Sequence, residues 1–255
     1  MCIRDREETL SMLSDGLIDA FSGISMGIIG ETIAEQFDVS RADQDRFAQN
    51  SQEKAVAASQ AGIFNDEIVA LGELSVDETP RPSSSLEKLA TLRTAFKENG
   101  TVTAGNSSPV NDGASALILA TKDYAEKHGI SYFAELVESA EVGIDPAIMG
   151  VSPIDAIQKL VQRSGVQLSE IDLFEINEAF AASSIAVNRE LGLKDSQVNI
   201  YGGAIALGHA IGSSGAKILT TLGYALKREQ KRYGIASLCI GGGLGLAILL
   251  KNPDF

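Results

Sequence analysis

The sequence predicts an α/β protein in which helices and sheets pack in layers. In the second half of the chain, short apolar runs typical of buried strands alternate with longer amphipathic segments typical of helices. The length of 255 residues is enough for one large domain or two of ordinary size. A hydrophobic content of 44% and a charged content of 22% are typical of globular proteins.

The first part of the chain is predicted to be mainly helical. Residues 1–8 are charged and show no periodicity, so we interpret them as a leader or a cut end. Helices are expected between residues 16 and 62, where Ser40 precedes Asp43 in the arrangement of a helix N-cap. The elements expected next, in chain order, are a strand at Glu67–Leu71, a surface loop at 72–85, a short helix at Leu86–Leu92, an irregular loop at Thr101–Gly113, a strand at Ala114–Ala120 and a helix to Gly129.

The second half of the chain is predicted to alternate between strands and helices. Its expected elements, in chain order, are a strand at Phe133–Ala140, a helix at 153–164, a strand at Asp172–Ile176, helices at 177–191 and 211–231, and strands at Ile235–Ile240 and Leu246–Leu250 joined by Gly241–Gly245.

Composition excludes several classes of protein. Lys and Arg total 21 against 34 Asp and Glu, so the net charge of −13 argues against a nucleic-acid partner. No apolar run approaches the ~18 residues that span a membrane, so we expect no membrane segment. Two cysteines far apart do not make a disulfide framework, and we therefore expect a reducing, cytoplasmic compartment.

Two glycine-rich turns carry the residues best suited to chemistry. His209 follows Gly208, and an imidazole can act as an acid or a base near neutral pH, although a surface or structural histidine is about equally expected. Cys239 ends an apolar run and is most simply a small buried hydrophobic residue. The glycines from Gly241 to Gly243 favour a functional interpretation, because their N–H groups can point at an oxyanion.

Asn177 and Phe180 have simple structural interpretations. Asn177 begins a predicted helix, where asparagine is a common N-cap, and the alternative is an amide that holds a water or a carbonyl group. Phe180 lies one turn later and is expected in the core.

Several ordered motifs together resemble those of one enzyme family, the thiolases. The resemblance covers nearly the whole chain after the first few residues. The motifs that carry it are Met26-Gly27, Ser40-Arg-Ala-Asp-Gln-Asp-Arg-Phe47, Asp66-Glu-Ile-Val69, Gly100-Thr-Val-Thr-Ala-Gly-Asn-Ser-Ser108, Asn111-Asp-Gly113, Asn177-Glu-Ala-Phe-Ala181, Gly202-Gly-Ala-Ile-Ala-Leu-Gly-His209 and Cys239-Ile-Gly-Gly-Gly243.

The resemblance implies a layered αβαβα thiolase fold that lacks its N-terminal part. Residues 9–130 would form the loop domain and the end of an incomplete N-terminal domain, and residues 131–255 a complete C-terminal domain. In the family the nucleophilic cysteine lies in a glycine-rich turn early in the chain. Cys2 has none of that context, so we do not assign it this role.

The resemblance also implies a reaction and a role for each site residue. Thiolases interconvert two acyl-CoA molecules with a 3-ketoacyl-CoA and free CoA. His209 would activate the nucleophilic cysteine, and Asn177 would hold a water in the first oxyanion hole. Cys239 would move the α-proton, with its pKa lowered by the imidazole and the glycine turn, and the Gly241 N–H would serve the second oxyanion hole.

Four further residues match positions that line the CoA or pantetheine site, namely Arg81, Ser108, Met26 and Phe180. A solvated loop arginine and a capped loop serine are the structural alternatives for the first two. We expect no metal and no cofactor beyond CoA and acyl-CoA as substrates. The resemblance implies a homo-oligomer, a dimer or a tetramer, and leaves the acyl chain length open.

Two other functions are weighed against acyl transfer. A non-catalytic CoA-binding or assembly fragment is favoured for the isolated chain, because the nucleophile is missing and the chain alone is expected to be inactive. A ketosynthase-like condensing enzyme needs two active-site histidines. The second histidine here, His128, lies at a predicted helix end without a glycine-rich turn, so this function is discounted.

Overall fold

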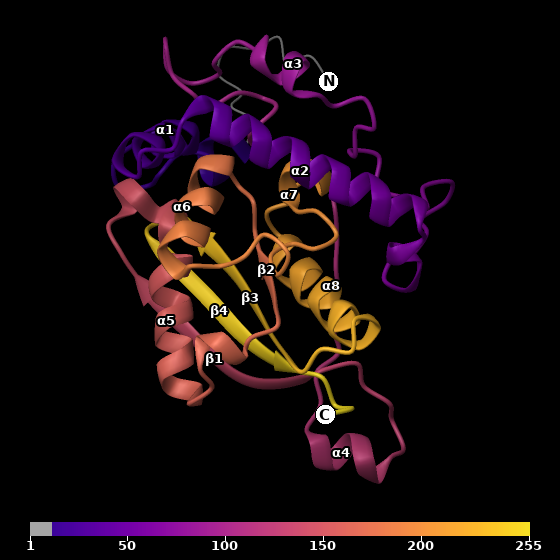
Figure 1. The fold of residues 1–255 in the computed structure, drawn as a ribbon. Helices are drawn as coiled ribbons and strands as arrows, with labels where there is room; N and C mark the ends of the chain where they lie inside the picture. Colours follow the sequence, from indigo (N-terminus) through magenta and orange to yellow (C-terminus); the bar gives the residue numbers. More distant parts are fainter. Residues whose placement is uncertain (1–11) are drawn as a thin grey trace.

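A four-stranded sheet forms the centre of the computed structural model, which describes residues 12–255 (Figure 1). The strands lie in the order β1-β4-β3-β2. Neighbouring strands are antiparallel except for β2 and β3, which are parallel. The strand bounds are β1 Glu135–Gly143, β2 Leu173–Ile176, β3 Tyr233–Ile240 and β4 Leu244–Lys251.

Eight α-helices are described, together with four short helices of other types. The α-helices are α1 Met26–Gln36, α2 Arg41–Gln60, α3 Leu86–Ala90, α4 Lys122–Lys127, α5 Pro153–Ser164, α6 Ala181–Leu191, α7 Ala204–Leu207 and α8 Ser214–Arg228. The short ones are the π-helix η1 Met12–Gly16 and the 3₁₀-helices η2 Ile63–Asp66, η3 Pro146–Val151 and η4 Leu168–Glu170. The predicted N-cap of α2 is confirmed, because the Ser40 side chain accepts the Asp43 N–H.

Helices cover both faces of the sheet. Successive residues of a strand point to opposite faces, so Leu249 joins one apolar cluster and Leu250 the other. The cluster under α8 contains Leu222, and the cluster under α5 contains Leu160. In Figure 1, α5 and α8 flank the sheet, and α1 and α2 run across one end of it. The predicted α/β class with layered packing is confirmed.

Two predicted strands are wrong. The segment Glu67–Leu71 forms only an isolated bridge between Leu71 and Leu74, and Val69 is 91% exposed. The segment Ala114–Ala120 is not a strand either, and Ile118 is 99% exposed. A strand is stabilised by the hydrogen bonds of its neighbour, and no described strand lies beside either segment.

Three element boundaries differ from the prediction in ways that matter for the site. The helix expected from Asn177 begins at Ala181, so residues 177–180 form an extended entry to α6. The helix expected from residue 211 begins at Ser214. The glycine turn is only Gly241–Gly243, and β4 begins directly after it.

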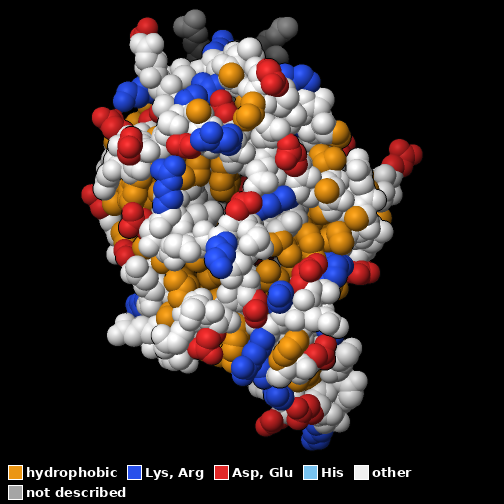
Figure 2. Space-filling model, in the orientation of Figure 1, with side chains coloured by type: hydrophobic (Ala, Val, Ile, Leu, Met, Phe, Trp, Pro, Cys, Tyr) orange, Lys and Arg blue, Asp and Glu red, His pale blue; other side chains and the backbone are white. Residues whose placement is uncertain are grey.

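The surface seen in Figure 2 mixes acidic and basic side chains, with hydrophobic side chains visible between them. Within residues 12–255 no helix is both long and apolar enough to cross a membrane. The predicted leader at residues 1–8 and Cys2 lie outside the described part of the chain.

Candidate active site

The candidate site lies at the carboxyl ends of β2 and β3, where Asn177 and Cys239 are found. These strands are parallel, with Ile176 opposite Ser237, and the Asn177 N–H donates to the Ser237 carbonyl oxygen at 3.0 Å. Asn177, directly after β2, and Cys239, the last residue but one of β3, therefore lie at the same end of the sheet. Ligands of α/β proteins commonly bind at this end.

His209 lies in the turn between α7 and α8 and contacts two side chains. Its Nε2 is 3.3 Å from Asn177 Nδ2, and its Nδ1 is 2.6 Å from Ser214 Oγ. The Ser214 hydroxyl donates its single proton to the Ala210 carbonyl oxygen at 2.9 Å, so Nδ1–H of His209 is the donor to Ser214. In the neutral ring this leaves the lone pair on Nε2, which accepts from the Asn177 amide.

The backbone around His209 explains why the ring is held there. Gly208 adopts φ +87°, and a Cβ at this position would come within 2.5 Å of Asn111 Oδ1, so only glycine fits. The same Asn111 oxygen accepts the His209 N–H at 3.3 Å. Burial lowers the pKa of His209, and the charge of Lys217 lowers it further. The imidazole is therefore a neutral base at neutral pH.

Cys239 is partly buried and packs against the apolar cluster that contains Met26, with Phe180 at its edge. Burial raises the pKa of its thiol to about 11. The lowered pKa expected from the imidazole and the glycine turn is therefore wrong for this structure. Desolvation of the thiolate outweighs a backbone hydrogen bond that favours it, and the thiol is neutral at pH 7.

The glycine turn after Cys239 faces α1. Gly242 and Gly243 adopt φ of +83° and +85°. A Cβ on Gly241 would lie 3.9 Å from the terminal methyl of Met26, so this residue of the turn lies beside the first residue of α1. A Cβ on Gly243 would meet the Ile144 carbonyl oxygen at 2.2 Å, which requires glycine for the close approach.

Ser108 and Phe180 are joined through the entry to α6. Both the N–H and the hydroxyl of Ser108 donate to the Ala179 carbonyl oxygen, at 3.0 and 3.1 Å. The Phe180 ring packs edge-on against Phe96 with centroids 6.3 Å apart. The loop at 101–113 is thereby tied to the segment that carries Asn177.

Among the described residues, Arg81 makes no hydrogen bond or ion pair with the other candidate site residues. Its backbone N–H donates to Gln52 Oε1 at 2.7 Å, and its side chain is exposed. Its predicted role in CoA binding stays a prediction.

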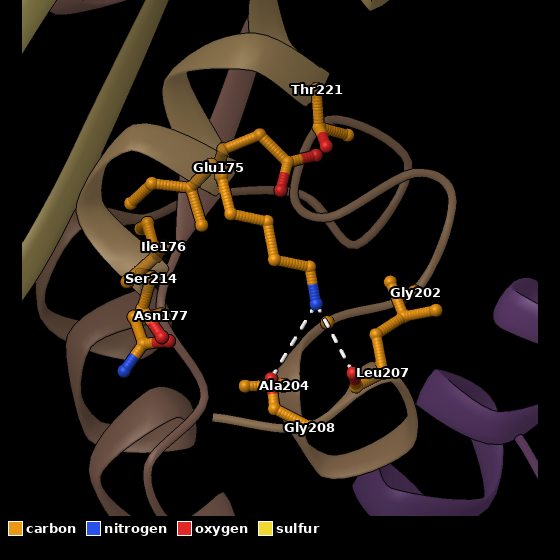
Figure 3. A pocket seen from close by; sticks show the side chains of 12 residues that line it. Glu175, Ile176, Asn177, Gly202, Ala204, Leu207, Gly208, Ser214 and Thr221 are labelled. Atoms are coloured by element: carbon orange, nitrogen blue, oxygen red, sulfur yellow. Dashed lines mark hydrogen bonds between the residues drawn. The ribbon is translucent and has the colours of Figure 1, made fainter. Parts of the chain in front are cut away.

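Sequence reasoning missed three residues that contact or surround His209. Ser214 could have been found, since it lies five residues after the histidine in the same small-residue run. The contact with Asn111 joins residues 98 positions apart, and no local pattern predicts it. Lys217 lines a cavity beside the site with Glu175 and Asn177 (Figure 3).

Within the described residues no cluster of three His, Cys, Asp or Glu could hold a metal ion.

Comparisons with known proteins agree on one family. The family model "Thiolase, N-terminal domain" matches residues 2–123, and "Thiolase, C-terminal domain" matches residues 130–252. The chain is 49% identical to a probable acetyl-CoA acyltransferase of Staphylococcus epidermidis, over 96% of this chain and 64% of the relative. It is 47% identical to an acetyl-CoA acetyltransferase of Paracoccus denitrificans, over 95% and 64% of the two chains.

Solved structures give the same result. The crystal structure of the Bacillus anthracis acetyl-CoA acetyltransferase matches with a TM-score of 0.92 and 39% identity, over 97% of this chain and 65% of that one. Human mitochondrial 3-ketoacyl-CoA thiolase in complex with CoA matches with a TM-score of 0.92 and 40% identity, over 98% and 67%. The chain spans 64% of the length of the two curated relatives. With both of its halves matched by thiolase domains, the chain belongs to the thiolase family.

Proposed function

We propose that this chain supplies the proton-transfer half of a thiolase site that exchanges acyl groups between CoA thioesters. The observation that carries the proposal is the contact of His209 Nε2 with the Asn177 amide, at the same end of the sheet as Cys239. A neutral imidazole can take the proton of a nucleophilic thiol at Nε2 when the thiol replaces the Asn177 amide as the donor to that nitrogen. The amide of Asn177 can orient a water toward a thioester oxygen.

Cys239 is proposed to move the α-proton of the acyl group. A group of pKa about 11 holds its proton firmly, and its thiolate is correspondingly a stronger base than an ordinary cysteine thiolate. That strength suits the deprotonation of a carbon acid. At pH 7 only about one thiol in 10⁴ is ionised, so the thiolate has to be generated within the reaction cycle. The Gly241 N–H is proposed to stabilise the resulting enolate oxygen.

The CoA thioester is proposed to reach this end of the sheet between α1 and the entry to α6. Met26 and Phe180 pack in the same apolar region as Cys239, which suits an uncharged pantetheine arm. Ser108 adds a polar group at the border of this region. Arg81 is proposed to meet the phosphates, because its exposed guanidinium is free to bind them bidentately.

A non-catalytic CoA-binding or assembly role is the second candidate. The specific observation that favours it is that Cys2, the one cysteine besides Cys239, lies in Met-Cys-Ile-Arg without a glycine-rich turn. The proposed reaction needs a nucleophile to hold the acyl group and a base to move the proton, and Cys239 is proposed for the second role. We therefore propose that the 255-residue chain alone forms no acyl-enzyme. By its resemblance to the family, the working protein is also proposed to be a homo-oligomer.

Mass spectrometry after incubation with acetyl-CoA tests this division of roles. The chain alone is expected to stay unmodified. Mixed with an N-terminal thiolase segment that carries the nucleophilic turn, it should yield an acetyl adduct on the added cysteine. A stable adduct on Cys2 or Cys239 of the chain alone, with turnover, would overturn the assignment of the nucleophile. CoA binding without any adduct in the mixture would favour the non-catalytic role.

A further inference from the structure

A partly buried cation contacts the turn that carries the histidine. Lys217 is on the first turn of α8, and its Nζ donates to the carbonyl oxygens of Leu207 at 3.1 Å and Gly208 at 3.5 Å. The dashed lines in Figure 3 mark these two bonds. Leu207 ends α7, and Gly208 immediately precedes His209. The lysine therefore ties α8 to the turn that carries the imidazole.

Lys217 lines a cavity together with the residues that contact the imidazole ring of His209. The cavity is lined by Lys217 and by Asn177 and Ser214, whose side chains contact the two ring nitrogens of His209. Residues from β2, from α7 and its flanking turns, and from α8 close around this space (Figure 3). A charge in such a partly desolvated space acts on its neighbours more strongly than it would in water.

The charge of Lys217 acts on the imidazole in a known direction. Protonation of His209 would place a second positive charge near the ammonium group, and a like charge disfavours the charged form. Burial is the larger cause of the lowered pKa of His209, and Lys217 is the second. The other ring contacts, Asn177 and Ser214, are neutral and do not offset this repulsion.

Four acidic groups act electrostatically on Lys217. Burial lowers the pKa of the lysine, while the nearby carboxylates oppose this change. Burial also raises the pKa of Glu175, on β2, well above its usual value, which favours its neutral form. The acidic residues that act on Lys217 are Asp77 in the loop before Arg81, Glu175, Glu67 after η2, and Glu178 in the entry to α6.

We propose that Lys217 is a positioning residue for His209, in which the partly buried ammonium group holds the carbonyl groups before the imidazole and its positive charge opposes that of a protonated ring. The inference deepens the proposed function and rests on it for its purpose, because a neutral ring is what a general base requires. The lysine touches neither substrate nor reacting atoms in this role and acts through the histidine.

Nuclear magnetic resonance of labelled histidine tests the inference on the whole chain. The sequence has only two histidines, so H128Q assigns both signals. The pKa and tautomer of His209 are compared in the wild type, K217M, K217Q and K217R. Glutamine keeps a donor for the carbonyl groups but removes the charge, and arginine keeps the charge. K227M, at an exposed position of the same helix, is the matched control.

The expected result is a higher His209 pKa in K217M and K217Q, and an unchanged value in K217R and K227M. An unchanged His209 pKa in a folded K217Q would overturn the proposal. A wild-type His209 that titrates at or above the ordinary value of about 6.5 would overturn it without any variant. This measurement of the His209 pKa does not require turnover. If the expected pKa shifts are found but the chain fails to support acyl transfer, the proposed function is wrong and the inference about Lys217 stands.

Discussion

The thiol of Cys239 gives a quantitative test of the site as the structure describes it. Burial raises its pKa from the usual 9.0 to about 11, so the thiolate fraction below pH 9 falls about 100-fold. The intrinsic nucleophilicity of a thiolate rises with its pKa at a Brønsted slope of roughly 0.4–0.5. The higher pKa therefore makes the Cys239 thiolate about 6–10 times more nucleophilic and offsets part of the loss. The net expectation is an alkylation rate about 10–15 times slower than that of an ordinary thiol, before any effect of steric access.

The pH dependence separates ionisation from steric access. The C2S variant leaves Cys239 as the sole thiol, and its alkylation by iodoacetamide is followed by mass spectrometry from pH 7 to the highest pH at which the chain stays folded. The rate should rise about tenfold per pH unit without reaching a plateau below pH 10. Steric shielding alone would slow the reaction equally at every pH. A plateau at or below pH 9 would refute the burial argument.

Three further predictions address stability, binding and surface. L222A, which truncates a fully buried side chain on α8, should lower the free energy of unfolding by about 2–5 kcal/mol in urea denaturation, and a smaller loss would mean that the core collapses around the change. R81A should weaken CoA binding in titration calorimetry more than R93A, which changes an exposed arginine twelve residues later in the chain, and equal affinities would remove Arg81 from the site. Replacing Ile118 and Leu119, which are 99% and 78% exposed, by lysine should reduce dye binding and aggregation, and an unchanged dye signal would place the exposed apolar surface elsewhere.

The periodicity of the sequence predicted the C-terminal part of the fold well, since each buried strand there has a neighbour. The strand at 173–176 and the helix at 153–164 follow directly from their apolar spacing and from Pro153 at the helix start. Ala114–Ala120 has the same apolar character but no described neighbouring strand, and its Ile118 and Leu119 side chains are exposed. An apolar run shows that a segment can be buried, and only tertiary structure shows whether it is.

The site was predicted in part. The motifs identified His209 and Asn177, and their contact follows from the strand–turn geometry. The raised pKa of Cys239 could not be read from the sequence, because it depends on how much apolar surface from α1 and the entry to α6 covers the thiol. The role inferred for Lys217 depends likewise on the folding of α8 against the turn before His209. The domain boundary at residue 130 and the cytoplasmic compartment stay predictions.

Thiolysis of acetoacetyl-CoA in a reconstituted site tests the central claim most directly. The chain is mixed with, or fused to, an N-terminal thiolase segment that carries the nucleophilic cysteine, and the loss of substrate absorbance is followed with free CoA present. Activity should appear in the mixture and fall to background in H209A and in C239A, and C239S should lose nearly as much because a hydroxyl is a far weaker acid than a thiol. K227M should keep full activity. A reconstituted enzyme that stays active without His209 or Cys239 would contradict the account.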